Sequence, residues 1–115
     1  MSARIAPVKF RIMRGDEIAI RPGKADLLAA IERTGSISGA AKSLGMSYRR
    51  AWNLVDTMNR CFREPLVATA TGGDQGGGAA ITDFGRDVLK RFNAMQASAD
   101  RALATEIKAF AELMN

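Results

Sequence analysis

Between residues 35 and 62, apolar and polar positions follow the period of an α-helix in two successive stripes. Ser36 is a good N-cap for the helix of the first stripe, and Gly45 can end that helix in the left-handed conformation. Ser47 can cap the second helix after a turn of only a few residues. Two short helices joined by a tight turn predict a helix-turn-helix. The apolar positions are Ile37, Ala40, Ala41 and Leu44 in the first stripe, and Ala51, Leu54, Val55, Met58, Cys61 and Phe62 in the second.

The opposite face of the second helix is polar and largely basic. Because Arg pairs with guanine and Asn with adenine in the major groove, this face suits direct reading of DNA bases. An ordinary amphipathic surface helix is the alternative, but the capped helix and glycine turn before it favour nucleic-acid binding. Tyr48 lies at the exposed start of the helix, the end that a recognition helix directs at the groove. The polar face carries Arg49, Asn53, Asp56 and Arg60, with Arg50 and Thr57 beside them.

The N-terminal segment has the pattern of a β-hairpin. Residues 8–13 alternate between apolar and basic side chains, which is the period of a half-buried strand. A turn follows at Arg14-Gly15-Asp16, and residues 17–20 can form the returning strand. We expect Pro22-Gly23 to close this hairpin, which occupies residues 1–22.

A further helix is predicted over about residues 24–34, with Leu27, Leu28 and Ile31 facing inward. Gly35 ends it. This helix should brace the helix-turn-helix pair, so that residues 24–63 form a three-helix core.

A glycine-rich hairpin is predicted after the recognition helix. That helix must stop near Arg63, because Pro65 disfavours the helical conformation at the residue before it. Residues 66–70 and 79–82 are candidate strands, and the segment between them has five glycines in eight residues. A strand, a glycine-rich loop and a strand form a wing over residues 66–82, whose backbone can approach DNA closely. A loose hairpin tip without a function is the alternative.

The C-terminal segment, residues 83–115, contains no proline and is predicted to form a long helix capped by Thr82. A break near residues 98–100 would divide it into two helices. Its apolar side chains form the stripes Phe84, Val88, Phe92, Met95 and Ala99, and Leu103, Ile107, Phe110 and Met114. A second copy of the same helix could cover them, or the helix could fold back on its own domain. The expected dimerisation residues are Phe92, Met95, Leu103, Ile107, Phe110 and Met114.

Composition and charge fit a DNA-binding protein. The chain has 115 residues, enough for a single domain over residues 1–115, and a formal net charge of +5. Residues 1–63 carry 12 Lys and Arg and 5 Asp and Glu, whereas residues 64–115 carry 5 and 7. The positive charge therefore lies on the half with the helix-turn-helix, as a phosphate-binding surface requires.

Several classes of site are disfavoured. One cysteine and no histidine leave no basis for an intramolecular disulfide, a zinc site or a Cys/His or Ser/His catalytic arrangement. We read Cys61 as a small core residue. We expect no enzyme activity, no cofactor and no bound metal. No apolar run has the length of a signal-peptide core or a membrane span, so we expect a cytoplasmic protein.

Four sequence patterns together resemble a known family over about residues 24–95. They are Gly-Ser-Ile-Ser-x-Ala-Ala-Lys at 35–42, Met-Ser-Tyr-Arg-x-Ala-Trp at 46–52, Met58-Asn59, and Thr71-Gly72-Gly through Gly76-Gly-Gly-Ala79 to Thr82. The chain is similar here to the N-terminal DNA-binding domain of ModE-type molybdate-dependent transcription regulators. The glycine-rich wing separates it from the related LysR-type winged helices. The resemblance implies a winged helix-turn-helix that dimerises through helices and binds palindromic operator DNA.

The expected fold is mostly α with small β: an N-terminal hairpin, a winged helix-turn-helix and a long C-terminal dimerisation helix. The family's molybdate-binding domains should follow that helix, so we expect a regulator that lacks the molybdate-sensing domain. The expected function is a dimeric, sequence-specific DNA-binding transcriptional regulator, and the alternative is a winged-helix protein-interaction module without DNA binding. The expected DNA-binding residues are Ser36, Lys42, Ser47, Tyr48, Arg49, Arg50, Asn53, Thr57, Gly72, Gly73, Gly76, Gly77 and Gly78.

Overall fold

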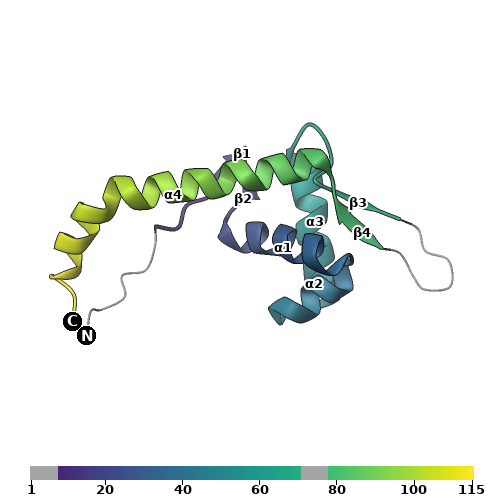
Figure 1. Ribbon diagram of the computed structural model, residues 1–115, viewed down its shortest axis with the longest axis horizontal. Helices are drawn as coiled ribbons and strands as arrows, with labels where there is room; N and C mark the ends of the chain where they lie inside the picture. Colours follow the sequence, from purple (N-terminus) through teal and green to yellow (C-terminus); the bar gives the residue numbers. More distant parts are fainter. Residues whose placement is uncertain (1–7, 71–77) are drawn as a thin grey trace.

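The computed structural model describes residues 8–70 and 78–115 and confirms a mostly helical winged-helix fold (Figure 1). The described elements are β1 (Ile12–Arg14), β2 (Glu17–Ile20), α1 (Pro22–Thr34), α2 (Ile37–Leu44), α3 (Tyr48–Cys61), β3 (Val67–Thr69), β4 (Ala79–Ile81) and α4 (Asp83–Ala111). In these two ranges, none of the helices is both long enough and apolar enough to cross a bilayer.

The core is built around α1, α2 and α3, and residues of β2, the wing and α4 complete it. α1 contacts both helices of the helix-turn-helix and also β4 and α4, so it is the central element of the fold. Leu27, Leu28 and Ile31 are fully buried on its inner face. Ala40 of α2 and Ala51 of α3 have no exposed surface, and their small side chains allow the two helices to cross closely.

The predicted helix caps are confirmed. The Ser36 hydroxyl oxygen accepts a hydrogen bond from the Gly39 amide at 2.8 Å, and Ser47 accepts one from the Arg50 amide at 3.1 Å. Thr82 caps α4 in the same way. Gly45 ends α2 with φ at 68°, a left-handed conformation that costs little for glycine. These caps fix where α3 begins, and therefore which side chains lie at its exposed start.

The N-terminal hairpin is shorter than predicted. β1 begins at Ile12, whereas residues 8–11 run beside α4: the Val8 amide donates to the Asp100 carboxylate at 2.9 Å. The Phe10 ring lies 5.1 Å from the Phe92 ring, centroid to centroid. The prediction that Pro22-Gly23 closes the hairpin is also wrong. These residues form the first turn of α1, because the fixed φ of proline suits the first helical position and its missing amide hydrogen has no partner to lose there.

The wing is confirmed as an antiparallel pair in which Val67 lies opposite Ile81 and Thr69 opposite Ala79. α3 ends at Cys61, two residues before the predicted stop. The Asn59 side chain holds the connection to the wing: its oxygen accepts from the Leu66 amide at 2.8 Å and its nitrogen donates to the Val67 carbonyl at 3.0 Å. Gly72, Gly73, Gly76 and Gly77 lie outside the described residues.

α4 is one continuous helix of 29 residues, so the predicted break near residues 98–100 is wrong. This stretch contains neither proline nor glycine, and the helix propensity of Ser and Asp is only slightly below that of good helix formers. Leu89 and Phe92 in the first half are buried against the core. The second half extends beyond the three-helix core and curves toward its C-terminal end (Figure 1).

Candidate nucleic-acid interface

The exposed start of α3 presents four neighbouring side chains. Tyr48, Arg49, Trp52 and Asn53 occupy positions related by one and four residues, so they form a compact patch on the helix surface. They line a hollow of about 340 Å³. Tyr48 is 56% exposed and Trp52 is 46% exposed, although both are large aromatic residues. The patch therefore combines two groups that can hydrogen-bond to bases with two rings that offer apolar surface.

A second hollow, of about 230 Å³, lies between this patch and the loop-side ends of the two wing strands. Tyr48 and Trp52 form one wall of it, and Ser38 of α2 contributes to the lining. The opposite wall comes from the residues where β3 and β4 meet the glycine-rich segment: Thr69, Ala70, Gly78 and Ala79. Of the wing glycines expected to contact DNA, Gly78 is thus described and lies beside the recognition helix. α3 and the wing together form one continuous surface. Such a surface allows a helix to enter a DNA groove while a neighbouring element contacts the backbone.

The hydroxyl groups predicted to contact DNA fall into two classes. The oxygens of Ser36 and Ser47 accept helix-capping hydrogen bonds, which leaves each hydroxyl proton able to reach a phosphate. Thr57 instead donates its hydroxyl to the Asn53 carbonyl at 3.0 Å and is half-buried. Its proton is already used within α3, so Thr57 is a weaker candidate. Lys42 is exposed in the last turn of α2.

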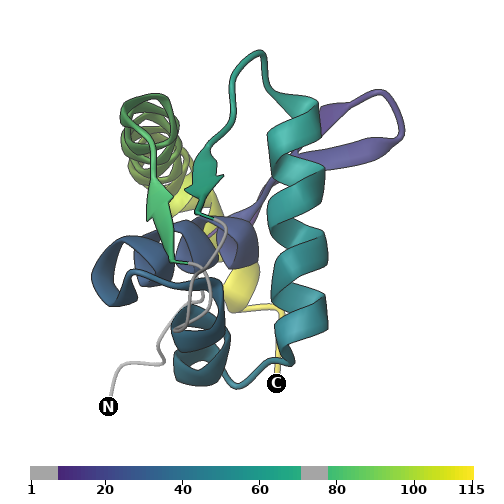
Figure 2. The same cartoon turned by 90° about the vertical axis from the view of Figure 1, so that its right-hand side faces the viewer.

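Arg60 lies on the polar face of α3 as predicted, but it is not a free cation. It bonds to Asp56 at 3.1 Å and to Glu17 of the hairpin at 3.2 Å. The hydrogen bond with Asp56 and then the charge of Glu17 raise the pKa of Arg60. The C-terminal end of α3 therefore holds the hairpin, and the candidate interface lies at the other end of the helix. Figure 2 shows β1 and β2 beside the C-terminal end of α3, with α2 beside its start.

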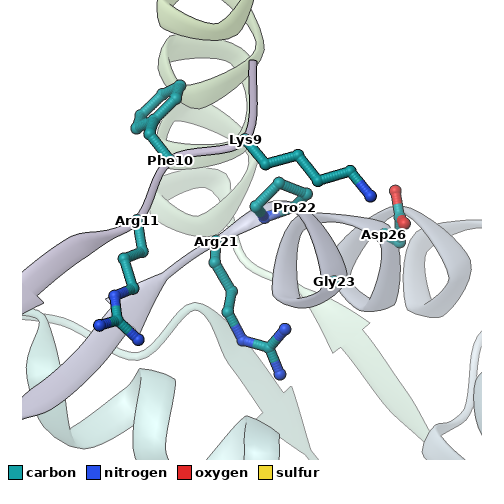
Figure 3. A pocket seen from close by; sticks show the side chains of 7 residues that line it. All are labelled: Lys9, Phe10, Arg11, Arg21, Pro22, Gly23 and Asp26. Atoms are coloured by element: carbon teal, nitrogen blue, oxygen red, sulfur yellow. The ribbon is translucent and has the colours of Figure 1, made fainter. Parts of the chain in front are cut away.

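The N-terminal basic residues gather at a different place. Lys9, Arg11 and Arg21 line a hollow of about 460 Å³ at the start of α1 (Figure 3). Figures 1 and 2 place the hairpin at the far end of α3 from Tyr48, so these cations do not adjoin the recognition patch. Part of the basic charge of residues 1–63 therefore lies outside the candidate interface.

Lys24 also contributes less to the surface charge than its place in the sequence indicates. It is 4% exposed, and its ammonium group donates to the Ile18 carbonyl. Burial lowers the pKa of Lys24, because a charged group loses hydration inside the protein. Its charge supports the joint between α1 and the hairpin.

The predicted dimerisation residues are of two kinds. Phe92 is 3% exposed and packs on Phe10 within the same chain, so it cannot be an interface residue on the surface. Sequence periodicity placed it on the stripe but could not show that residues 8–10 cover it. Most of the large apolar side chains from residue 95 to the C-terminus are exposed, and Leu113, at 81%, belongs with them. The other exposed members are Met95, Leu103, Phe110 and Met114, and Ile107 is half-buried.

Trp52, Ser38, Thr69 and Ala70 were absent from the predicted DNA-binding residues. Trp52 entered the sequence predictions only as part of the pattern at residues 46–52. Its spacing of four residues from Tyr48 was the signal that could have placed it on the same helix face. The wing residues had no comparable signal, since only the folded chain brings them beside α3.

Comparison with known proteins gives partial matches. No protein-family model matches the chain. The chain is 48% identical over 77 residues to the molybdenum transport protein ModE of Azotobacter vinelandii and 44% identical over 79 residues to the molybdenum-pterin-binding protein MopB of Rhodobacter capsulatus. It is 40% identical over 72 residues to the DNA-binding transcriptional dual regulator ModE of Escherichia coli K12.

These matches cover 67%, 69% and 63% of this chain, but only 28%, 29% and 28% of the relatives. The chain thus spans less than a third of the length of the curated relatives that it matches. The predicted resemblance to ModE-type regulators is confirmed, and it is confined to that shared part.

Proposed function

We propose that this chain is a sequence-specific DNA-binding transcriptional regulator of the ModE type that acts as a dimer. The observation that carries the proposal is the exposed patch of Tyr48, Arg49, Trp52 and Asn53, which lies beside the loop-side ends of the wing strands. The sequence similarity to a DNA-binding dual regulator supports the same conclusion.

In the proposed complex, the start of α3 enters the major groove. Arg49 and Asn53 are exposed on one face, where they can pair with guanine and adenine respectively, and Arg50 lies beside them. The helix-capping hydroxyls and the Lys42 ammonium contact phosphates on either side and fix the register. The wing, whose strands end beside Trp52 where they meet the glycine-rich segment, approaches the neighbouring DNA backbone.

The exposed half of α4 provides the proposed dimer interface. Met95, Leu103, Ile107, Phe110 and Met114 form apolar surface that the three-helix core does not cover. Pairing with a second copy buries this surface symmetrically, and most homodimers are two-fold symmetric. Two recognition helices related by such an axis would read a palindromic operator with half-sites about one helical turn apart.

Exposed aromatic residues also favour a second candidate function, a protein-interaction module. Tyr and Trp are enriched at protein interfaces, and Tyr48 and Trp52 lie in the open here. The two functions differ in their dependence on salt and base sequence. Protein docking through two aromatic rings depends little on salt and does not depend on base sequence. DNA binding weakens steeply with salt.

The test is selection of duplexes from a random DNA library by the 115-residue chain, followed by measurement of affinity for selected and random duplexes. We expect enrichment of a two-fold symmetric sequence. Arg49→Ala should abolish the enrichment, whereas Arg91→Ala, a matched charge loss on exposed α4, should preserve it. If the wild-type chain retains no duplex at low salt, the proposal is wrong and the interaction module is favoured.

A further inference from the structure

The two aromatic rings on α3 are not part of the core. Ala51, Val55 and Met58 are the residues through which α3 packs on the domain, and all three are buried. Tyr48 and Trp52 point away from that side and retain about half of their surface in water. Large apolar surface kept at the start of a recognition helix is available for a ligand, because the folded chain does not use it.

Each ring lines both hollows of the candidate interface. On one side, Tyr48 and Trp52 adjoin Arg49 and Asn53. On the other side they face the loop-side ends of the wing strands. Tyr48 and Trp52 are four residues apart and form an aromatic row along the helix. Arg49 and Asn53, each one position later, form a polar row beside it. A base pair that meets the polar row therefore also meets the aromatic row.

An adenine–thymine pair has the complementary arrangement on its major-groove edge. Adenine offers N7 and the N6 amino group, which an asparagine amide can bind through two hydrogen bonds. Thymine offers O4 and, beyond it, a 5-methyl group, the one apolar group among the four bases in this groove. If Asn53 binds the adenine, the aromatic side chains next to it on α3 are the apolar groups available to contact the methyl group of the paired thymine.

We propose that Tyr48 and Trp52 read the 5-methyl group of thymine at the base pair that Asn53 contacts, or at its neighbour. This inference rests on the proposed function and goes beyond it, because it assigns sequence selectivity to two apolar side chains. Arg49 and Asn53 then recognise a base by its hydrogen-bonding groups, while the two rings distinguish thymine from cytosine and from unmethylated uracil.

The test removes single methyl groups from DNA. A duplex selected by the wild-type chain is resynthesised with one thymine at a time replaced by deoxyuridine, which keeps every hydrogen-bonding group and lacks only the methyl. We expect about fourfold weaker binding at one or two thymines in each half-site, the effect of losing one buried methyl group. Trp52 is the one tryptophan of the chain, so its fluorescence reports on the same site during the titration.

Variants of the chain separate the rings from the rest of the interface. Trp52→Ala and Tyr48→Ala should bind thymine and deoxyuridine duplexes with more nearly equal affinity. Trp52→Phe and Tyr48→Phe keep an apolar ring and should keep the preference for thymine. Lys42→Ala should weaken binding to both duplexes by the same factor. Because both rings are exposed, circular dichroism should show unchanged folding of the alanine variants.

The outcomes are distinct for the two proposals. Sequence-specific binding with equal affinity at every thymine and deoxyuridine position would overturn the methyl contact and leave the proposed function standing. An unchanged thymine preference in both alanine variants would also overturn it. Failure of the chain to select any duplex would overturn the proposed function and this inference together.

Discussion

Gly85, in the first turn of α4, lies directly against the backbone of Leu66, which leads into the wing. A β-carbon at position 85 would stand 2.9 Å from the Leu66 carbonyl carbon and 2.9 Å from its α-carbon. These are backbone atoms, so they cannot rotate away as the end of a side chain can. The close approach joins α4 to the wing, and it explains why a glycine occupies a helix where alanine is otherwise the better helix former.

We predict that Gly85→Ala destabilises the fold by about 3 kcal/mol, because overpacking outweighs the gain in helix propensity. Gly23→Ala is the matched control. It also lies in the first turn of a helix, but its β-carbon would meet only the end of the Arg21 side chain, at 3.4 Å. Urea denaturation should show Gly23→Ala to be at least as stable as wild type. Equal stability of the two variants would contradict the close packing on Leu66.

Asn59 is predicted to fix the position of the wing. Its side chain accepts hydrogen bonds from the Leu66 and Val67 amides and donates one to the Val67 carbonyl. Asn59→Ala leaves these backbone groups without partners, at a cost of about 1–3 kcal/mol. We expect faster amide hydrogen exchange in β3 and β4, with the three-helix core less affected. The control Asn93→Ala, on the exposed surface of α4, should change the exchange rates of neither the wing strands nor the core. If Asn59→Ala instead accelerates exchange uniformly across the chain, a local role of Asn59 is contradicted.

Base readout is predicted to depend on Asn53 and Arg50. Replacing either by alanine should cost about 1–3 kcal/mol on the selected duplex and little on random DNA, since a base contact contributes only where its base is present. Competition binding against both duplexes measures the difference. If the two affinities fall equally, the residue contacts phosphate and carries no sequence information.

Local chemistry accounts for what the sequence could predict. The caps of α2, α3 and α4 depend on Ser36, Ser47 and Thr82, each next to the helix that it caps, so a short window contains the whole interaction. The start of α3, and with it most of the candidate site, follows from these caps. Sequence periodicity also placed the buried face of α1 correctly.

Contacts between distant residues account for what the sequence could not predict. Val8 and Asp100 are 92 positions apart, and their hydrogen bond takes residues 8–11 away from the hairpin and onto α4. Arg60 has the spacing of an exposed cation, but Glu17 of the hairpin, 43 positions away, neutralises it. A charge pattern along one helix contains no information about such partners.

The salt dependence of DNA binding tests whether exposed cations contact phosphates while the ion-paired Arg60 does not. Log affinity for DNA should fall by about 0.9 for each unit of log salt per phosphate neutralised. Lys42→Ala removes one exposed cation and should reduce the slope by about 1. Arg60→Ala should leave the slope unchanged, because Asp56 and Glu17 already pair with that guanidinium. A slope reduced equally by both substitutions would place Arg60 on the DNA after all.

The exposed half of α4 should hold the dimer together. Leu103 and Phe110 are 39% and 65% exposed on one apolar stripe. Changing each to aspartate in the full chain preserves Asp100, whose bond to Val8 a truncation after Ala99 would remove. Each change should weaken the dimer by about ten- to a hundredfold, because the interface loses the buried area of a large apolar side chain and gains a carboxylate in its place.

Sedimentation velocity over a range of concentrations measures this shift, with Lys108→Ala on the same part of the helix as the control, because it also makes the net charge more negative by one. Urea denaturation should show that the monomer core is intact, because neither side chain contributes to it. Affinity for the selected duplex should fall along with dimerisation, since two half-sites bound by linked protomers contribute together. An unchanged dimer in the double variant would show that the stripe faces solvent in the assembly and that the interface lies on another surface of the chain.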